Sequence, residues 1–205
     1  MGPLRPVILV HGIFGNRHLY WNLFRHRLRA DGVRFHEVVL PAGLLGDMRI
    51  AAGVLRAKVD ATLRGDGVPK VDLVCHSAGG LVARDYLKFL DGAKHVDRLV
   101  LMGAPNQGTH VARLLPLAPI AMRRQASPGS NFLREIDGPV PPGVTATNLW
   151  SPVDGIVVPS RNAILEGAKN VELAWVHHWG MLLHRSVYDA VLAGLGRESA
   201  TKPQP

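Results

Sequence analysis

Cysteine is nearly absent from this chain of 205 residues, in which Cys75 is the only example. A single cysteine excludes an intramolecular disulfide and a metal site built from several thiolates. The histidines are not spaced like metal ligands either, because His177 and His178 are adjacent and no H-E-x-x-H sequence occurs. We therefore expect a protein that uses no metal and no other cofactor.

Long apolar runs are also lacking. The longest ones, Val7–Val10, Val38–Leu40 and Ile156–Val158, are strand-sized, whereas a membrane-spanning helix needs about 18 or more consecutive apolar residues. We expect no transmembrane segment. The start, MGPLRPVILV, has no basic leader and no A-x-A-like cleavage site, so we expect no signal peptide in this chain. This fits a cytoplasmic protein, or a secreted protein whose signal has been removed.

Runs of basic residues are missing as well, although the formal net charge is +8. The densest cluster is Arg123-Arg124, and aromatic residues do not alternate with the basic ones. A nucleic-acid-binding protein gathers its positive charge on one stripe or face, so we expect no nucleic-acid partner. The charge pattern predicts a solvated basic surface that favours anionic interfaces or substrates.

What the chain does contain is a regular alternation of strand-sized apolar runs and helical patterns. This predicts βαβ units around a mostly parallel sheet of about six strands with helices on both faces. The expected strands are Val7–Val10, Phe35–Leu40, Val71–Cys75, Arg98–Met102, Thr145–Trp150 and Val171–Val176. The expected helices are Tyr20–Arg29, Asp47–Leu63 with Asp47 as its N-cap, Ser77–Leu90 and Met181–Leu195.

The length and a composition that is 47% hydrophobic predict a single domain over residues 1–205, for which a monomer is favoured. Between about residues 107 and 142 the pattern breaks down into apolar stretches punctuated by proline. We interpret this part as a loop-rich cap or lid insertion, with Thr109–Ser127 as the possible lid. Residues from about 197 to 205 are expected to form a flexible tail.

Ser77 lies in VDLVCHSAGG, residues 71–80, which has the pattern of a strand, a tight turn and a helix. This is the context of the nucleophile elbow, G-x-S-x-G, where the serine sits on a strained turn between small neighbours. Gly79 is the second of these neighbours, and Cys75 stands where the first glycine is usual. We predict Ser77 as a nucleophile. The alternative is an N-cap serine on an ordinary strand-to-helix turn.

An oxyanion hole is predicted beside the elbow. HGIFG, residues 11–15, follows the first expected strand, and its glycines let the backbone turn an N–H toward the site. We assign the backbone N–H groups of Ile13 and Ala78 as the donors and expect His11 to brace the loop. A plain glycine-rich turn is the alternative.

The acid and the base should follow late strands, in the chain order Ser, Asp, His. Asp154 lies on the turn after Thr145–Trp150 and would orient the imidazole, although Asp-Gly is also a common turn-former. Asp97 and Asp137 precede strands and are weaker candidates. Three histidines follow the last expected strand. We favour His178, on the loop before the closing helix, over His177 and His184.

These segments together resemble the small class 2 triacylglycerol lipases of bacteria, which include the minimal secreted lipases of Bacillus. The resemblance covers most of residues 5–195 and rests on VHGI (10–13), VDLVCHSAGG (71–80), LDG (90–92), GAPN (103–106), SPVDGIV (151–157) and HWGMLL (178–183). It implies a compact α/β-hydrolase fold and a Ser77–Asp154–His178 triad, because the histidine before x-Gly-x-Leu-Leu is the catalytic one in that family. A small residue other than glycine can occupy the position of Cys75 there. The segment Thr109–Ser127 is longer than in the minimal members.

We therefore expect a carboxylic ester hydrolase, a lipase or esterase, that forms an acyl-enzyme on Ser77. Its partner is an ester or lipid substrate, presented at an oil–water interface in the lipase case. Candidate substrate-binding residues are Phe14, Leu114 and Leu117. Together with Leu45, Leu115 and Ile120 they fit the lining of an acyl groove, although each of the six fits the ordinary core equally well. Acyltransferase, polyester depolymerase, thioesterase and amidase activities share the same triad. An alternative from a different class of function is a binding protein that has the hydrolase fold but no catalytic activity.

Overall fold

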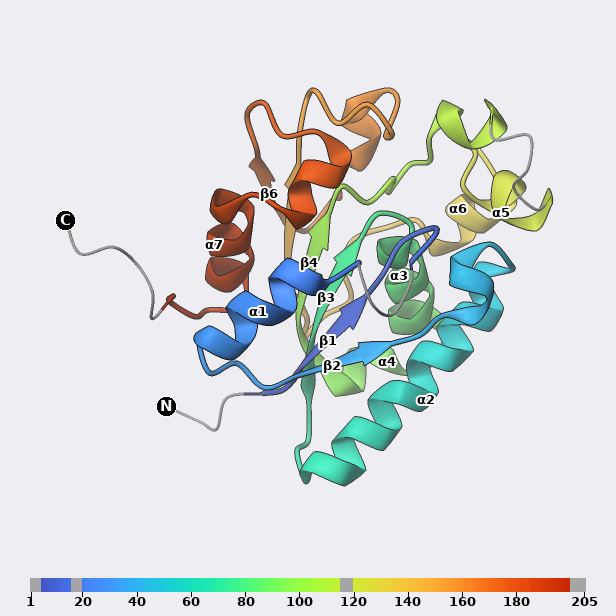
Figure 1. The fold of residues 1–205 in the computed structure, drawn as a ribbon. Helices are drawn as coiled ribbons and strands as arrows, with labels where there is room; N and C mark the ends of the chain where they lie inside the picture. Colours follow the sequence, from blue (N-terminus) through green and yellow to red (C-terminus); the bar gives the residue numbers. More distant parts are fainter. Residues whose placement is uncertain (1–4, 16–19, 115–119, 200–205) are drawn as a thin grey trace.

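The computed structural model describes residues 5–15, 20–114 and 120–199. Its centre is a parallel sheet of six strands in the order β2-β1-β3-β4-β5-β6 (Figure 1). The strands are β1 (Val7–Val10), β2 (Phe35–Val38), β3 (Val71–His76), β4 (Val96–Met102), β5 (Thr145–Trp150) and β6 (Lys169–Glu172). Both β1 and β3 are fully buried, as apolar strands in the middle of a parallel sheet must be.

Helices cover both faces of this sheet (Figure 1). On one face lie α1 (Asn22–Ala30) and α7 (Arg185–Gly194), whose Phe24 and Tyr188 are fully buried against it. On the other face lie α2 (Met48–Asp66) and α3 (Gly79–Phe89), followed by the short α4 (Gly92–His95). The expected α/β architecture with helices on both faces is confirmed. Because all strands run parallel, the loops that follow them meet along one edge, here called the carboxyl edge.

The N-terminus of α2 shows how local sequence sets an element boundary. Asp47 accepts a hydrogen bond of 2.8 Å from the backbone N–H of Arg49, so its side chain caps the helix as predicted. The helix ends at Gly67, which adopts the left-handed conformation that favours glycine.

Two predicted elements near the C-terminus were wrong in extent. The last strand is Lys169–Glu172 rather than Val171–Val176, because this edge strand is set by its pairing with β5 and has mostly exposed side chains. Leu173 and Val176 lie in the turn after this strand, and their side chains are buried in the core. The closing helix Met181–Leu195 is divided into a 3-10 helix, His178–Leu182, and α7, with an extended His184 between them.

The segment from 107 to 142 contains short helices rather than loops alone. They are a 3-10 helix (His110–Leu114), α5 (Ile120–Gln125) and α6 (Asn131–Ile136). Ala112 and Met122 are buried in the main core, so this segment, here called the cap, is packed onto the domain. At the end of the chain, Arg197 forms an ion pair with buried Asp72 at 3.5 Å.

Candidate active site

Ser77 occupies the turn between β3 and α3, at the carboxyl edge. Its φ of +55° places it in the left-handed region, which is strained for a residue with a side chain. The backbone N–H of Ser77 donates to the carbonyl of Met102 on β4 at 2.9 Å, which fixes the turn to the neighbouring strand. Such a strained serine between a strand and a helix has the geometry of a nucleophile elbow.

The small neighbours of Ser77 are required by close packing. A Cβ on Gly79 would lie 2.6 Å from the carbonyl oxygen of His11, so the loop after β1 passes directly against the start of α3. Cys75, at the other small position, is fully buried, and burial raises the pKa of its thiol. A buried thiol with a raised pKa is a packed side chain and not a second nucleophile.

Asp154 and His178 form a buried pair, with exposed fractions of 3% and 2%. Nδ1 of His178 lies 2.9 and 2.8 Å from the two carboxylate oxygens of Asp154. The backbone adds a further link, because the N–H of His178 donates to the carbonyl of Asp154 at 3.0 Å. An ionised carboxylate only accepts hydrogen bonds, so Nδ1 carries the proton and Nε2 is the nitrogen able to accept one.

The carboxylate of Asp154 is itself held in place. One of its oxygens accepts hydrogen bonds from the backbone N–H groups of Ile156, at 2.9 Å, and Val157, at 2.7 Å. The tight turn after β5 thus orients the acid, which in turn orients the imidazole.

Gly103 joins the elbow to this pair. It follows Met102, whose carbonyl holds Ser77, and a Cβ added to it would lie 3.0 Å from a carboxylate oxygen of Asp154 and 3.1 Å from Nδ1 of His178. The structure therefore gathers the sequence-predicted Ser77, Asp154 and His178 around the ends of β3, β4 and β5.

The loop after β1 supplies the other wall of the site. A Cβ on Gly12 would lie 2.6 Å from Cβ of Ser77, so this loop passes over the elbow. Within the described residues, the backbone N–H groups of Ile13 and Ala78 have no protein acceptor. Free N–H groups on either side of a strained serine suit the binding of a developing oxyanion.

His11 braces that loop, as the sequence predicted. Its Nε2 accepts a hydrogen bond of 3.0 Å from the N–H of Leu40, so its Nδ1–H donates to the carbonyl of Gly12 at 2.8 Å. Burial lowers the pKa of His11, which keeps the ring neutral and both bonds in place.

A buried hydrogen-bond chain connects the same loop to His178. The N–H of Gly12 donates to the hydroxyl of Tyr20 at 2.9 Å, and that hydroxyl lies 2.6 Å from Nδ1 of His76. Since the tyrosine oxygen already accepts from Gly12, its own hydrogen points to Nδ1. Nε2–H of His76 then donates to the carbonyl of His178 at 3.1 Å.

Burial, with a smaller effect from nearby His178, lowers the pKa of His76 well below its ordinary value. The ring is therefore neutral, which the hydrogen-bond chain requires. Neither Tyr20 nor His76 was predicted as part of the site. His76 directly precedes Ser77, so its place in the motif was a usable signal, whereas nothing in the sequence connects Tyr20 with either.

Residues 2–123 match a family model described as a domain of unknown function, DUF7379. That match spans more than half of the 205 residues. The chain belongs to the DUF7379 family. The matched part includes the loop after β1 and the elbow of this DUF7379 protein, whereas Asp154 and His178 lie beyond it.

Solved structures share the fold of the DUF7379 chain at low identity. Lipase B of Aspergillus fumigatus has a TM-score of 0.82 and 22% identity, with 97% of this chain and 54% of the lipase covered. The mature form of Bacillus licheniformis lipase BlEst2 has a TM-score of 0.81 and 18% identity, with coverages of 94% and 93%. The ydeN gene product of B. subtilis has a TM-score of 0.66 and 17% identity, with coverages of 94% and 100%.

The DUF7379 chain thus spans about half of the Aspergillus lipase, at 54%, and nearly all of the mature Bacillus lipase, at 93%. Together with the parallel sheet, this likeness shows that the chain has the α/β-hydrolase fold.

The alternative acids and bases of the DUF7379 protein are exposed or paired with other residues. His177 and His184 are exposed. Asp97, near the start of β4, forms an ion pair with Arg5 at 2.7 Å, at the opposite edge of the sheet. The side chain of Asp137 is exposed in the cap.

The candidate substrate-binding residues are exposed where they are described. Phe14 is 62% exposed and Leu114 is 76% exposed, and Ile120 is exposed as well. Leu45 is half-buried against the main core. Leu115 and Leu117 lie outside the described residues.

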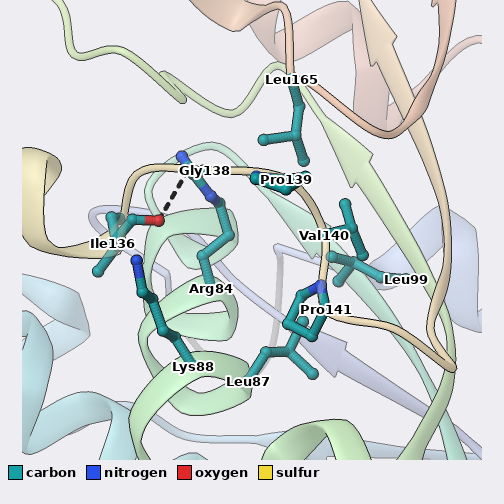
Figure 2. A pocket seen from close by; sticks show the side chains of 10 residues that line it. All are labelled: Arg84, Leu87, Lys88, Leu99, Ile136, Gly138, Pro139, Val140, Pro141 and Leu165. Atoms are coloured by element: carbon teal, nitrogen blue, oxygen red, sulfur yellow. Dashed lines mark hydrogen bonds between the residues drawn. The ribbon is translucent and has the colours of Figure 1, made fainter.

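One recess of the DUF7379 protein lies apart from this site. Figure 2 shows it between α3 and residues 136–141, where the guanidinium of Arg84 donates to the carbonyl of Ile136 at 3.0 Å. None of Ser77, Asp154 and His178 lines it.

Among the described residues, no group of His, Cys, Asp and Glu could hold a metal ion, and no helix is long and apolar enough to cross a membrane.

Proposed function

We propose that this protein is a serine carboxylic ester hydrolase, acting on lipids or other apolar esters. The observation that carries the proposal is the buried Asp154–His178 pair against Gly103, together with a serine at φ +55° whose N–H is hydrogen-bonded to the neighbouring Met102. A serine hydroxyl is a weak nucleophile at neutral pH and needs an adjacent base that a third group orients. Ser77, His178 and Asp154 are the groups of that kind at the carboxyl edge.

In the proposed reaction, Ser77 Oγ attacks the ester carbonyl while Nε2 of His178 takes its proton. The N–H groups of Ile13 and Ala78 bind the oxyanion, and Asp154 stabilises the imidazolium. The C–O bond to the alcohol then breaks, and His178 gives its proton to the leaving oxygen. Water, activated by His178, cleaves the acyl-enzyme and restores Ser77.

An apolar substrate is supported by the exposed side chains around the site. Phe14, Leu114, Ile120, Trp175 and Trp179 are all exposed, and all belong to segments that follow a strand at the carboxyl edge. Exposed large apolar residues that gather on one side of a molecule mark a surface for apolar ligands or lipid. The cap adds two of these residues, which supports its role as a lid or landing surface.

The direct test is covalent labelling with a fluorophosphonate probe, together with turnover of p-nitrophenyl esters. We expect the probe to modify Ser77, and Ser77→Ala to lower kcat by about 10⁴-fold or more. His178→Ala should have a similar effect, whereas the matched variant His177→Ala, at an exposed ring, should keep near wild-type activity. Near wild-type turnover by Ser77→Ala would refute the assignment.

Acyl transfer, polyester cleavage, thioester hydrolysis and amide hydrolysis would use the same groups. Product analysis with an added alcohol separates transfer from hydrolysis, and a chain-length series of esters with and without an oil–water interface separates lipase from esterase. If the probe does not modify the folded protein at all, the enzyme hypothesis is wrong, and a non-catalytic binding protein becomes the better hypothesis.

A further inference from the structure

Most of the cap carries only positive charge, and its acidic residues come near its end, where Glu135 is paired with Arg49 and Asp137 lies 4.0 Å from Arg84. From Gln107 to Arg134 the sequence has four arginines and no aspartate or glutamate. Elsewhere arginines are commonly paired, as in Arg5 with Asp97 at 2.7 Å and Arg34 with Asp66 at 2.9 Å. Within the described residues, none of the cap residues Arg113, Arg123 and Arg124 forms an ion pair.

These three arginines line one open depression of about 330 Å³ together with Ile120 and Ser127. The guanidinium of Arg123 is held there by donating to the carbonyl of Arg113 at 2.8 Å, while its buried Nε has no partner among the residues that the structure describes. Leu114 and Ile120 are 76% and 64% exposed beside the charges. We call Arg113, Leu114, Ile120, Arg123 and Arg124 the arginine face.

The cap that bears this face is attached at the carboxyl edge. The hydroxyl of Thr109 donates to the carbonyl of Ile156, and the N–H of His110 donates to the carbonyl of Val158, both in the turn after Asp154. At its other side, Gln125 accepts a hydrogen bond of 2.9 Å from the N–H of Met48 at the start of α2. The arginine face therefore flanks the same edge as Ser77.

We propose that the arginine face binds the surface of an anionic phospholipid membrane and so brings Ser77 to esters in that membrane. The use of this surface in catalysis rests on the proposed function, whereas membrane binding itself does not. Guanidinium groups form paired hydrogen bonds with phosphate, and exposed aliphatic side chains enter the boundary between headgroups and acyl chains. The combination of cations and aliphatic side chains, without aromatic rings for base stacking, favours a lipid surface over a nucleic acid.

The test is sedimentation with vesicles of phosphatidylglycerol or of phosphatidylcholine, using the Ser77→Ala protein so that no hydrolysis alters the lipid. We expect binding to phosphatidylglycerol that weakens with added NaCl, and much weaker binding to phosphatidylcholine. The combined variant Arg113→Gln, Arg123→Gln, Arg124→Gln should lose about 100-fold in partition coefficient, from about fivefold per arginine.

The matched control removes the same charge from the outer face of α2, as Arg56→Gln, Lys58→Gln, Arg64→Gln. It should keep partition within about threefold, because charges facing away from a membrane contribute little beyond a Debye length. Equal losses in both combined variants, or equal binding to the two lipids, would overturn the proposal. So would tighter binding to single-stranded RNA than to the anionic vesicles.

Activity on a soluble ester separates this inference from the proposed function. The cap variant, with Ser77 retained, should hydrolyse p-nitrophenyl butyrate like the wild type and lose turnover only on esters dispersed in anionic vesicles. A protein that binds these vesicles but has no esterase activity would refute the proposed hydrolase function and leave the membrane-binding proposal intact. Normal turnover on vesicles by the cap variant would refute the membrane-binding proposal and leave the hydrolase function intact.

Discussion

The hydroxyl of Tyr20 lies 2.6 Å from Nδ1 of His76, although 56 residues separate them. Through this contact the N–H of Gly12, in the loop over the elbow, is connected to the backbone carbonyl of His178. The position of the proposed oxyanion loop and that of the proposed base therefore depend on one buried hydroxyl.

Tyr20→Phe removes that hydroxyl while keeping the ring. We expect kcat on p-nitrophenyl butyrate to fall about 10- to 100-fold, because small displacements of positioned groups are costly, with KM little changed. The free energy of unfolding should fall by about 1–2 kcal/mol from the lost hydrogen bonds. Steady-state kinetics and urea denaturation measure the two effects.

The matched control is Tyr188→Phe, which removes a hydroxyl that donates to Asp31 at 2.6 Å, away from the site. It should lower stability to a similar degree and leave kcat unchanged. Equal kinetic effects from both variants would mean that Tyr20 acts only through general stability.

Gly103→Ala should impair catalysis by displacing the acid and the base. The new methyl group would lie about 3 Å from both Asp154 and His178, at a residue with φ +57°. We expect kcat to fall about 100-fold and stability to fall by about 1–2 kcal/mol. Gly67→Ala, at φ +63°, should show the stability loss alone, because the new methyl group would meet no packed atom of the described residues within 4 Å. Full activity of Gly103→Ala would show that its methyl group leaves the pair undisturbed.

Asp154→Asn should lower kcat by about 10⁴-fold, because an amide cannot hold the imidazole in the required tautomer or stabilise its cation. The matched variant is Asp137→Asn, at an exposed carboxylate in the cap. It should remain within about twofold of the wild type, as surface substitutions usually do. Kinetics at saturating substrate compare the two, and a larger effect from Asp137→Asn would reassign the acid.

Stability should fall as the pH is lowered below about 6.5. The pKa values of His11 and His76 are lowered by burial, so below the ordinary pKa of histidine the unfolded chain binds protons that the folded chain does not. The free energy of unfolding then falls with pH, by about 1.4 kcal/mol per pH unit for each histidine. Urea denaturation between about pH 7.5 and pH 5.5 measures this slope.

His76→Gln should remove about half of that slope, and His26→Gln, at an exposed ring, should leave it unchanged. Burial raises the pKa of Asp72 and Asp85, so at lower pH the folded protein binds protons on these carboxyls that the unfolded chain does not. This effect increases stability as the pH falls, and it sets the lower limit of the pH range in which the histidine slope can be measured. A slope that His76→Gln does not alter would show that His76 is protonated in the folded protein.

Local sequence was sufficient where an element depends on its own residues. The buried strand Val7–Val10, the strand Thr145–Trp150 and the Asp47 cap of α2 have the predicted positions, because apolar runs and a capping side chain act over a few residues. The strand-turn-helix around Ser77 was predicted for the same reason, since glycine and other small residues are needed where two backbones approach closely.

Tertiary structure decided what depends on distant partners. Which of three histidines meets Asp154 follows from burial by residues of several elements, and the edge strand β6 follows from its register on β5 rather than from its own hydrophobicity. Tyr20, in the turn before α1, and His76, at the end of β3, meet only in the folded chain. The sequence by itself determined which residue types are available and where the chain turns. Their alignment within hydrogen-bond distance required the folded sheet, because such bonds join atoms far apart along the chain.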